Sequence, residues 1–286
     1  MSSLEPAKNI RLDQYIVELI PELSRSFGSK LIEQGKVSVN GEIITKAGFK
    51  LHSTDKIKVD FDIAELKRIP DIELPILYED DDCVVIDKPV GVLSHSKGTF
   101  NPEATVASWL SHRFKGASGE RAGIVHRLDR ATSGVMICAK NPVASLWLQK
   151  QFSQRKVKKN YIAIVKGTPD PAEAIIDMPI ERNPKAPATF RVGTSGKPAV
   201  THYKIIKRSD PYSQLELTPQ TGRTHQLRVH LNQLGLPIVG DSFYGGEPAD
   251  RLYLHAFQLE ITLPDRSRRV FTADLPKAFS SKMKQL

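Results

Sequence analysis

Short apolar runs make up most of the chain beyond residue 75, and the short turns that join many of them restrict the possible folds. Such runs predict strands that pair with their sequence neighbours. Three longer segments with helical spacing predict helices: ATVASWLSHRF, PVASLWLQKQF and THQLRVHLNQLG. The predicted strands lie in ILYEDDDCVVIDKP, VMICAK, YIAIVKG, HYKII, YSQLELT, HAFQLEIT and RRVFTADL. Together these elements predict an α+β domain over residues 75–286, with a mixed, largely antiparallel sheet and flanking helices.

Residues 1–62 predict a separate, small α/β domain. One helix is expected before Pro21, and a second between Ser24, which can cap its first turn, and Gly35, which can end it. The pair Asn40-Gly41 predicts a tight hairpin turn, because both residues tolerate positive φ angles. Residues 63–74 are polar and charged and contain Pro70, so we interpret them as a linker.

The composition excludes several classes of protein. The chain has 286 residues, 40% of them hydrophobic, which is enough to fold a large domain and a small one. It contains no run of about 18 apolar residues and no N-terminal leader pattern, so we expect neither membrane insertion nor secretion. Cys83 and Cys138 stand alone within apolar runs, which predicts buried thiols in a reducing, cytoplasmic compartment and excludes a cysteine zinc cluster.

The positive charge is concentrated in one segment. The net charge is +9, and residues 112–160 carry eleven Lys and Arg against only Glu120 and Asp129. Residues 1–70 are nearly balanced, with eleven basic and ten acidic residues. A concentration of this kind favours binding to a polyanion such as nucleic acid, because phosphate neutralisation releases counterions. A solvated surface without a partner is the alternative.

The segment GIVHRLDRATSG (123–134) is the strongest candidate for chemistry. Thr132, Ser133 and Gly134 are small residues that can hold a loop through side-chain bonds to the backbone, and they follow Asp129. Asp129 is thus a carboxylate on an anchored loop within the basic segment, although a salt-bridge or turn role is also open. A protein-kinase loop is excluded, since Leu128 interrupts His-Arg-Asp and no Asn stands five residues after the Asp.

Two resemblances cover nearly the whole chain. HRLDRATSG resembles the central motif of the RluA-type pseudouridine synthases. It is followed in the family's order by KKNYIAIVKG, PQTGRTHQLRVHL, GLPIVGDSFYGG and LHAF. RLDQYIVELIPELSRSFGSKLIEQGKVSVNGEIITKAGFKLHSTDKIKV resembles the RNA-binding domain of the ribosomal-protein-S-four type. The resemblance implies an RNA pseudouridine synthase with an N-terminal RNA-binding domain, acting on uridines of large-subunit ribosomal RNA, and a monomer.

The resemblance also assigns roles to particular residues. The family's catalytic Asp falls on Asp129, its active-site Tyr on Tyr161 and the basic partner of the Asp on Arg223. Arg127 falls on the Arg that takes the place of the flipped base. The residues expected to contact RNA are Arg25 and Lys30 in the N-terminal domain and Lys156, Lys158 and Lys159 before Tyr161.

These residue types suit the reaction that the resemblance implies. Pseudouridine formation breaks the bond between uracil and ribose, turns the base and rejoins it through carbon 5. The carboxylate of Asp129 would act at the ribose as nucleophile or base, and Arg223 would hold it ionised. Tyr161 can stack on uracil and is a candidate for removing the carbon-5 proton. The reaction needs no oxidant and no energy input, so we expect no cofactor and no metal.

Three alternatives remain at this point. The chain could be a non-catalytic RNA-binding factor in ribosome assembly, or a synthase that acts on transfer RNA. A nucleoside hydrolase, the third alternative, would need a second carboxylate near Asp129, and the local sequence supplies only Glu120.

A metal site at His225 and His230 is disfavoured, because residues five apart do not share a helical face and no carboxylate completes the set.

Overall fold

The computed structural model describes residues 6–21, 23–62, 70–96, 103–117 and 122–284. The chain divides into two compact units. One comprises Met1–Ile72 and Ser96–Thr105, and the other comprises Glu73–His95 and Val106–Leu286. Most of the linker predicted at 63–74 lies outside the described residues, because 63–69 are not among them. The described part contains no helix with the length and apolarity needed to cross a bilayer.

The described residues of the first unit form two helices and a small antiparallel sheet. Helices α1 (Leu12–Leu19) and α2 (Arg25–Glu33) are followed by β1 (Val37–Val39), β2 (Glu42–Ile43) and β3 (Ile57–Val59), in the order β2-β1-β3. The Ser24 hydroxyl accepts the N–H of Phe27 and caps α2, as predicted. Asn40 and Gly41 have φ angles of 54° and 90° and form the predicted turn between β1 and β2.

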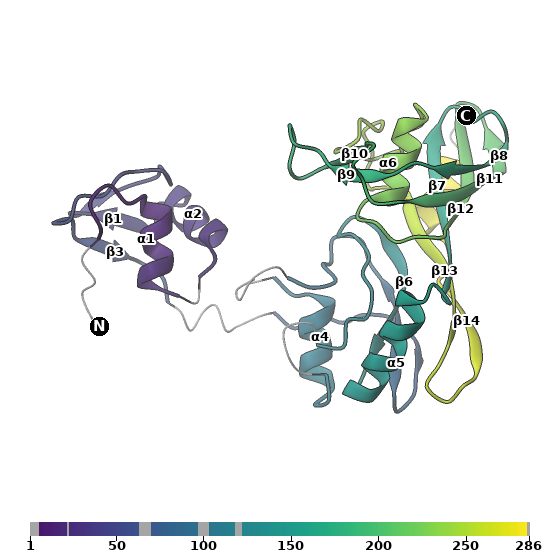
Figure 1. The fold of residues 1–286 in the computed structure, drawn as a ribbon, viewed down its shortest axis with the longest axis horizontal. Coiled ribbons are helices and arrows are strands. Elements are labelled where there is room, and N and C mark those ends of the chain that lie inside the picture. The colour runs from purple at the N-terminus through teal and green to yellow at the C-terminus, as the bar shows by residue number, and fades with distance from the viewer. Residues whose placement is uncertain (1–5, 22, 63–69, 97–102, 118–121, 285–286) are drawn as a thin grey trace. The chain divides into compact units, whose positions relative to one another are not determined.

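The second unit is built on one large twisted sheet (Figure 1). Its strands pair in the order β4-β5-β6-β13-β7-β12-β11-β8, and β14 also pairs with β13. All these pairings are antiparallel except β6 with β13, so the predicted α+β class with a mixed, largely antiparallel sheet is confirmed. The strands are β4 (Ile76–Glu79), β5 (Cys83–Lys88), β6 (Ser133–Ala139), β7 (Lys158–Lys166), β8 (Glu173–Asp177), β11 (Val200–Ser209), β12 (Tyr212–Pro219), β13 (Leu254–Thr262) and β14 (Arg268–Thr272).

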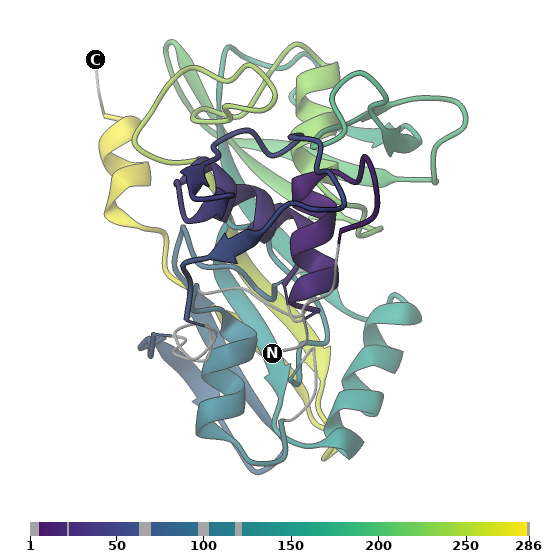
Figure 2. The same ribbon diagram turned by 90° about the vertical axis from the view of Figure 1, so that its left-hand side faces the viewer.

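In the part of the second unit that the structure describes, four helices and a small hairpin accompany this sheet. The three predicted helices are present as α4 (Val106–Arg113), α5 (Pro142–Ser153) and α6 (Gln226–Gln233). Figure 1 shows α6 between the large sheet and a hairpin of β9 (Ile180–Arg182) and β10 (Phe190–Val192). Figure 2 shows α7 (Lys277–Lys282), the yellow helix at the C-terminal end. The strands β8, β9 and β10 and the helix α7 were not predicted, because they are short.

Two clusters of buried apolar side chains pack the helices against this sheet. One cluster joins β7, β12 and β13 to α6 and α7, and another joins β5, β6 and β13 to α5. Cys83 and Cys138 are buried free thiols within the sheet, as predicted, and burial raises the pKa of both. The second unit therefore has a continuous, well-packed scaffold on which loops can be held rigidly.

Candidate active site

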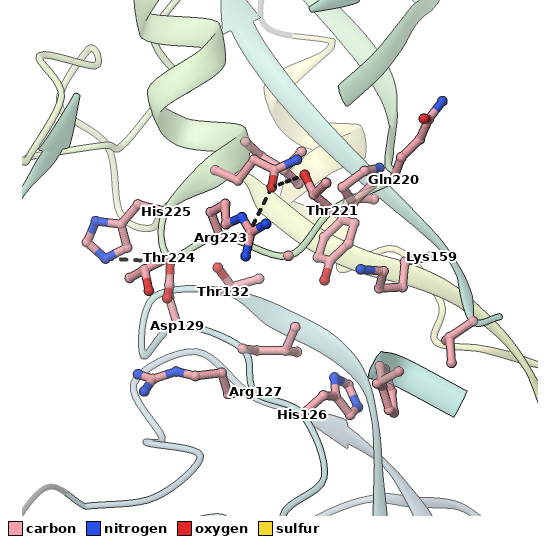
Figure 3. Close-up of a pocket in the computed structure, with 18 of the residues that line it drawn as sticks. His126, Arg127, Asp129, Thr132, Lys159, Gln220, Thr221, Arg223, Thr224 and His225 are labelled. Carbon is pink, nitrogen blue, oxygen red and sulfur yellow. Dashed lines mark hydrogen bonds and ion pairs between the residues drawn. The ribbon is translucent and has the colours of Figure 1, made fainter. Parts of the chain in front are cut away.

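A cavity of about 570 Å³ opens in the second unit between the Asp129 loop and the start of α6. Its wall is formed by the loop before β6, the end of α5, the start of β7 and the connection from β12 to α6. Figure 3 shows Asp129 and His225 on one side of this cavity and Lys159 on the other. Three segments that are far apart in sequence, namely 125–132, 159–161 and 219–228, thus meet in one hollow.

The Asp129 loop is tied down on both sides. The hydroxyl of Ser94, which is 2% exposed, donates to the carbonyl of Leu128 at 2.8 Å and accepts its N–H at 3.1 Å. After the Asp, the N–H of Thr132 donates to the carbonyl of Asp129 at 3.0 Å. Gly134 has a φ of 113° and lies so close to the backbone of Ala256 that a side chain could not be accommodated. The loop is therefore anchored, but through Ser94 and a backbone bond and not through the side-chain bonds to the backbone predicted for Thr132 and Ser133. The Ser133 hydroxyl instead bonds to the side chains of His255 and Arg251.

A fully buried lysine also helps to hold the Asp129 loop in place. Lys88 Nζ donates to the carbonyls of Pro89 and Val92 at 2.9 Å each and lies 3.4 Å from the carbonyl of Arg130. Burial lowers the pKa of Lys88 to about 8, and the nearby charge of Asp129 opposes that shift. The ammonium thus satisfies carbonyls that would otherwise be buried without donors.

Two basic side chains converge on one oxygen of Asp129. Arg228 Nη1 lies 3.5 Å and His225 Nε2 lies 3.7 Å from Oδ2, and the Asp129 side chain is 20% exposed. Arg228 is itself held by Asp241 through two bonds of 2.7 Å, from Nε and Nη2. Its guanidinium also lies over the rings of Phe243 and Tyr244, at 5.3 and 5.1 Å from their centroids. This geometry places a fixed positive charge beside the carboxylate.

The structure corrects the arginine assigned as the partner of Asp129. Arg223 precedes α6 and lines the cavity, and its Nε donates to the carbonyl of Pro198 at 3.0 Å. Its side chain forms no hydrogen bond or ion pair with Asp129 or with any other carboxylate of the described residues. Its backbone N–H donates to Gln226 Oε1, which orders the turn into the helix. Arg228 lies five residues further on, as the buried third residue of α6, and makes the pairing instead. A signal for this exists in the sequence, since Arg228 stands within the apolar run LRVHL.

The opposite wall carries Tyr161, Lys159 and His126. Burial raises the pKa of Tyr161, and the charge of Asp129 raises it further, so the phenol is protonated at neutral pH. Burial also lowers the pKa of Lys159. His126 Nε2 accepts the N–H of Ile137 at 3.1 Å, its ring stacks on Phe152 at 4.5 Å, and burial lowers its pKa to about 3. The neutral imidazole therefore has a structural role at the edge of the cavity.

The remaining predicted RNA contacts are distributed over the molecule. Arg127 is exposed and lines the cavity, as does Arg155, which the sequence analysis did not single out. Lys158 pairs with Glu260 at 3.2 Å, and Lys156 is exposed outside the cavity lining. Arg25 and Lys30 lie in the first unit. Lys30 is exposed, whereas Arg25 forms an ion pair with the buried carboxylate of Asp13.

No group of His, Cys, Asp and Glu side chains suited to a metal ion occurs within the described ranges. His230 is fully buried and bonded to Thr201 and to the carbonyl of Met178, so its role is structural. Only His225 of the two histidines reaches the cavity. The chemistry that this site offers is that of a carboxylate, a guanidinium and a phenol.

A carboxylate held beside an arginine, in a cavity lined by further basic residues, suits an enzyme that acts on a polyanionic substrate, and comparisons with known proteins identify the class. Residues 82–233 match the RNA pseudouridylate synthase family, and residues 10–57 match the S4 domain. The chain is 40% identical over 241 residues to ribosomal large subunit pseudouridine synthase D of Pasteurella multocida, covering 83% of this chain and 74% of that protein. It is 37% identical over 273 residues to the protein of the same name from Escherichia coli strain K12, covering 89% and 83%.

Solved structures agree with this family. Human RNA pseudouridylate synthase domain containing 1 superposes with a TM-score of 0.59 at 27% identity, over 75% of this chain and 96% of that chain. Human RNA pseudouridylate synthase domain containing 4 superposes with a TM-score of 0.58 at 29% identity, over 76% and 92%. The chain belongs to the RNA pseudouridylate synthase family and is an isomerase with an N-terminal S4 domain.

Proposed function

We propose that this enzyme converts uridine to pseudouridine in large-subunit ribosomal RNA, with Asp129 as its catalytic carboxylate. The observation that carries the residue assignment is the position of Asp129 on a doubly anchored loop in the cavity, with Arg228 and His225 at one of its oxygens. The names of the relatives from Pasteurella multocida and Escherichia coli support the choice of RNA. The cytoplasm is the location that fits such a substrate.

The cavity dimensions and its lining suit a single nucleotide taken out of its stack. A volume of about 570 Å³ lies in the range of small-ligand sites, and a base within structured RNA must leave its stack before its ribose can be reached. Arg127, exposed and two residues from Asp129, is proposed to fill the gap left in the RNA. Asp129 then acts at the ribose while the bond from carbon 1 to uracil N1 breaks, and Tyr161 provides a ring against which uracil can stack.

The protonated phenol of Tyr161 restricts how the carbon-5 proton can leave. After the new bond to carbon 5 forms, that carbon carries a proton that must be removed to restore the uracil ring. Since the pKa of Tyr161 is raised, the phenol can accept this proton only if it releases its own at the same time. Lys156, Lys158, Lys159, Arg25 and Lys30 are proposed to contact RNA phosphates, with Lys158 contributing least because it pairs with Glu260. The enzyme is proposed to work as a monomer without a cofactor.

The test is release of tritium from RNA labelled at carbon 5 of uridine. Large-subunit ribosomal RNA and transfer RNA are incubated separately with the wild-type protein and with Asp129→Asn. We expect release from ribosomal RNA by the wild type and a loss of about 1,000-fold or more in the variant. Release from transfer RNA alone would contradict the proposed substrate. Undiminished release by a folded Asp129→Asn would contradict the role of the carboxylate.

A further inference from the structure

His225 occupies an unusual backbone position beside the catalytic loop. It immediately precedes α6 with φ 57° and ψ 17°, in the left-handed region that residues with side chains rarely adopt. Its ring is enclosed by the rings of Phe190, Phe243 and Tyr244, with centroids between 5.6 and 6.1 Å away. A strained backbone and a ring held on three sides indicate that the surrounding structure imposes this orientation.

The hydrogen bonds of Tyr244 determine which nitrogen of His225 carries the proton. Tyr244 Oη lies 2.9 Å from the backbone nitrogen of Phe190, which can only donate, so the oxygen accepts there. The same oxygen lies 2.8 Å from His225 Nδ1. Because Tyr244 is 8% exposed, leaving its hydroxyl proton without an acceptor would be costly. The phenol therefore donates to Nδ1, which leaves the proton of a neutral His225 on Nε2.

The neutral form is the one that the surroundings favour. Burial lowers the pKa of His225, and the positive charges of Arg228 and Arg127 act in the same direction. The carboxylates of Asp129 and Asp241 act in the opposite direction. Nε2–H then faces Asp129 Oδ2 at 3.7 Å, beside Arg228 Nη1 at 3.5 Å. Both contacts converge on Oδ2, and Oδ1 has no hydrogen bond or ion pair with a described residue.

We propose that His225 is a positioning residue, held by Tyr244 as the Nε2–H tautomer, and that with Arg228 it fixes Asp129 through Oδ2 and presents Oδ1 to the ribose. This inference rests on the proposed catalytic role of Asp129. It connects three backbone segments: the start of β10 through the Phe190 N–H, the loop that carries Tyr244, and the loop that carries Asp129. No covalent step at the imidazole is involved, and its proton stays in place during the reaction.

Two substitutions of His225 separate this role from simple packing. The amide nitrogen of a Gln side chain lies about where Nε2 of His225 lies, so it can donate to Asp129. The amide nitrogen of an Asn side chain lies about where Nδ1 lies, so Asp129 loses this donor. Both side chains are polar and smaller than imidazole. We expect His225→Asn to lower kcat by about 30-fold or more and His225→Gln by about 3-fold, with KM for the labelled RNA changed by less than about 2-fold in both. Thermal unfolding confirms that both variants fold.

Equal losses of kcat in the two variants, or losses expressed in KM, would overturn the proposal. A packing role predicts that kcat falls in step with the thermal stability of each variant, because Asn removes more volume than Gln, whereas the proposal predicts a difference in kcat that the thermal stabilities do not follow. If the tritium-release assay detects no turnover by the wild type, the proposed function fails. A second measurement, on protein without RNA, tests the positioning role of His225 independently of that result.

That second measurement is the tautomer itself. In ¹⁵N NMR spectra of the full-length protein, a protonated Nε2 and an unprotonated Nδ1 have well-separated shifts, and comparison with His225→Gln assigns the signals of His225 among the eight histidines. We expect the Nε2–H form in the wild type at neutral pH and a mixture of both tautomers in Tyr244→Phe, which lacks the hydroxyl. A protonated Nδ1, or an imidazolium, in the wild type would overturn the proposal without reference to activity.

Discussion

Arg228 and Arg223 show how strongly the role of a side chain depends on its partners. They lie five residues apart in GRTHQLR, yet only Arg228 has its fork bonded to a buried carboxylate, Asp241, and a further nitrogen directed to Asp129. Lysine has one ammonium and cannot serve both carboxylates with this geometry. The chemistry of the site is therefore set by the shape of this guanidinium as well as by its charge.

We expect Arg228→Lys to lower kcat by about 100-fold, because the carboxylate loses a donor that is fixed in place before the reaction begins. Arg223→Lys is the matched control, since Arg223 contacts Pro198 and not Asp129, and its kcat should stay within about 3-fold of wild type. Single-turnover kinetics with labelled ribosomal RNA measure both. A greater loss in Arg223→Lys than in Arg228→Lys would show that the pairing found here does not operate during catalysis.

The loop that carries Asp129 depends on Ser94 for its conformation. Removing this hydroxyl leaves both the N–H and the carbonyl of Leu128 without their partner in a buried place. We therefore expect Ser94→Ala to destabilise the second unit by about 1–3 kcal/mol and to lower kcat more than it changes KM. Thermal unfolding and steady-state kinetics test this. Ser111→Ala, on the exposed face of α4, is the control and should leave both unchanged.

The helix pair of the first unit is joined by Asp13, which is 3% exposed and forms ion pairs with Arg11 and Arg25. The hydrogen bond from Arg11 is the main reason that the pKa of Asp13 is lowered, and burial opposes it. A lowered pKa in the folded state means that this contribution to stability is present above the ordinary carboxyl pKa of about 3.9 and is lost as the pH falls through the lowered value.

We accordingly expect Asp13→Asn to lower the melting temperature of the first unit at pH 7 and to have a smaller effect at a pH below the lowered pKa of Asp13, where the wild-type carboxyl is protonated as well. NMR signals of the α1 and α2 amides in the full-length protein report this melting. Glu33→Gln, at an exposed position of α2, is the control. A destabilisation by Asp13→Asn that is equal at both pH values would show that the ion pairs do not contribute.

Over the whole molecule, the net charge of +9 favours association with RNA, but only some of the basic residues face the cavity. Lys159 lines it, whereas Lys158, its neighbour on β7, points to the other side of the strand and pairs with Glu260. A lysine that neutralises an RNA phosphate contributes to the dependence of affinity on salt, because it releases a counterion.

We predict that Lys159→Gln reduces the slope of log affinity against log salt concentration by about one, and that Lys158→Gln changes it by much less. Binding of labelled ribosomal RNA over a series of salt concentrations gives both slopes. An unchanged slope in Lys159→Gln would mean that this lysine neutralises no phosphate. Substituting Lys156 together with the other two should lower the slope further, because Lys156 is exposed.

The fold class, the family and the longer elements of this protein could be predicted from its residues alone. Apolar periodicity was sufficient to predict the longer strands and three helices of the second unit. Buried side chains recur every two residues along a strand and every three to four residues along a helix. The order of the motifs was sufficient to recognise the family. The strands β9 and β10, which pair with each other, have three residues each, too few for a period to be recognised. The pairing of β8 is with β11, which lies further along the chain and is not its neighbour in sequence.

The tertiary structure decided which side chains work together. The sequence was sufficient to single out Asp129 as a candidate catalytic residue. Its partners, however, come from α6 and from the residue before that helix. The residues that orient those partners, Asp241 and Tyr244, lie in a further loop. The choice of Arg228 over Arg223 follows from the residue at which α6 begins and from the position of Asp241. Such pairings depend on distances in space between segments that are remote in sequence, and local patterns carry no information about those distances.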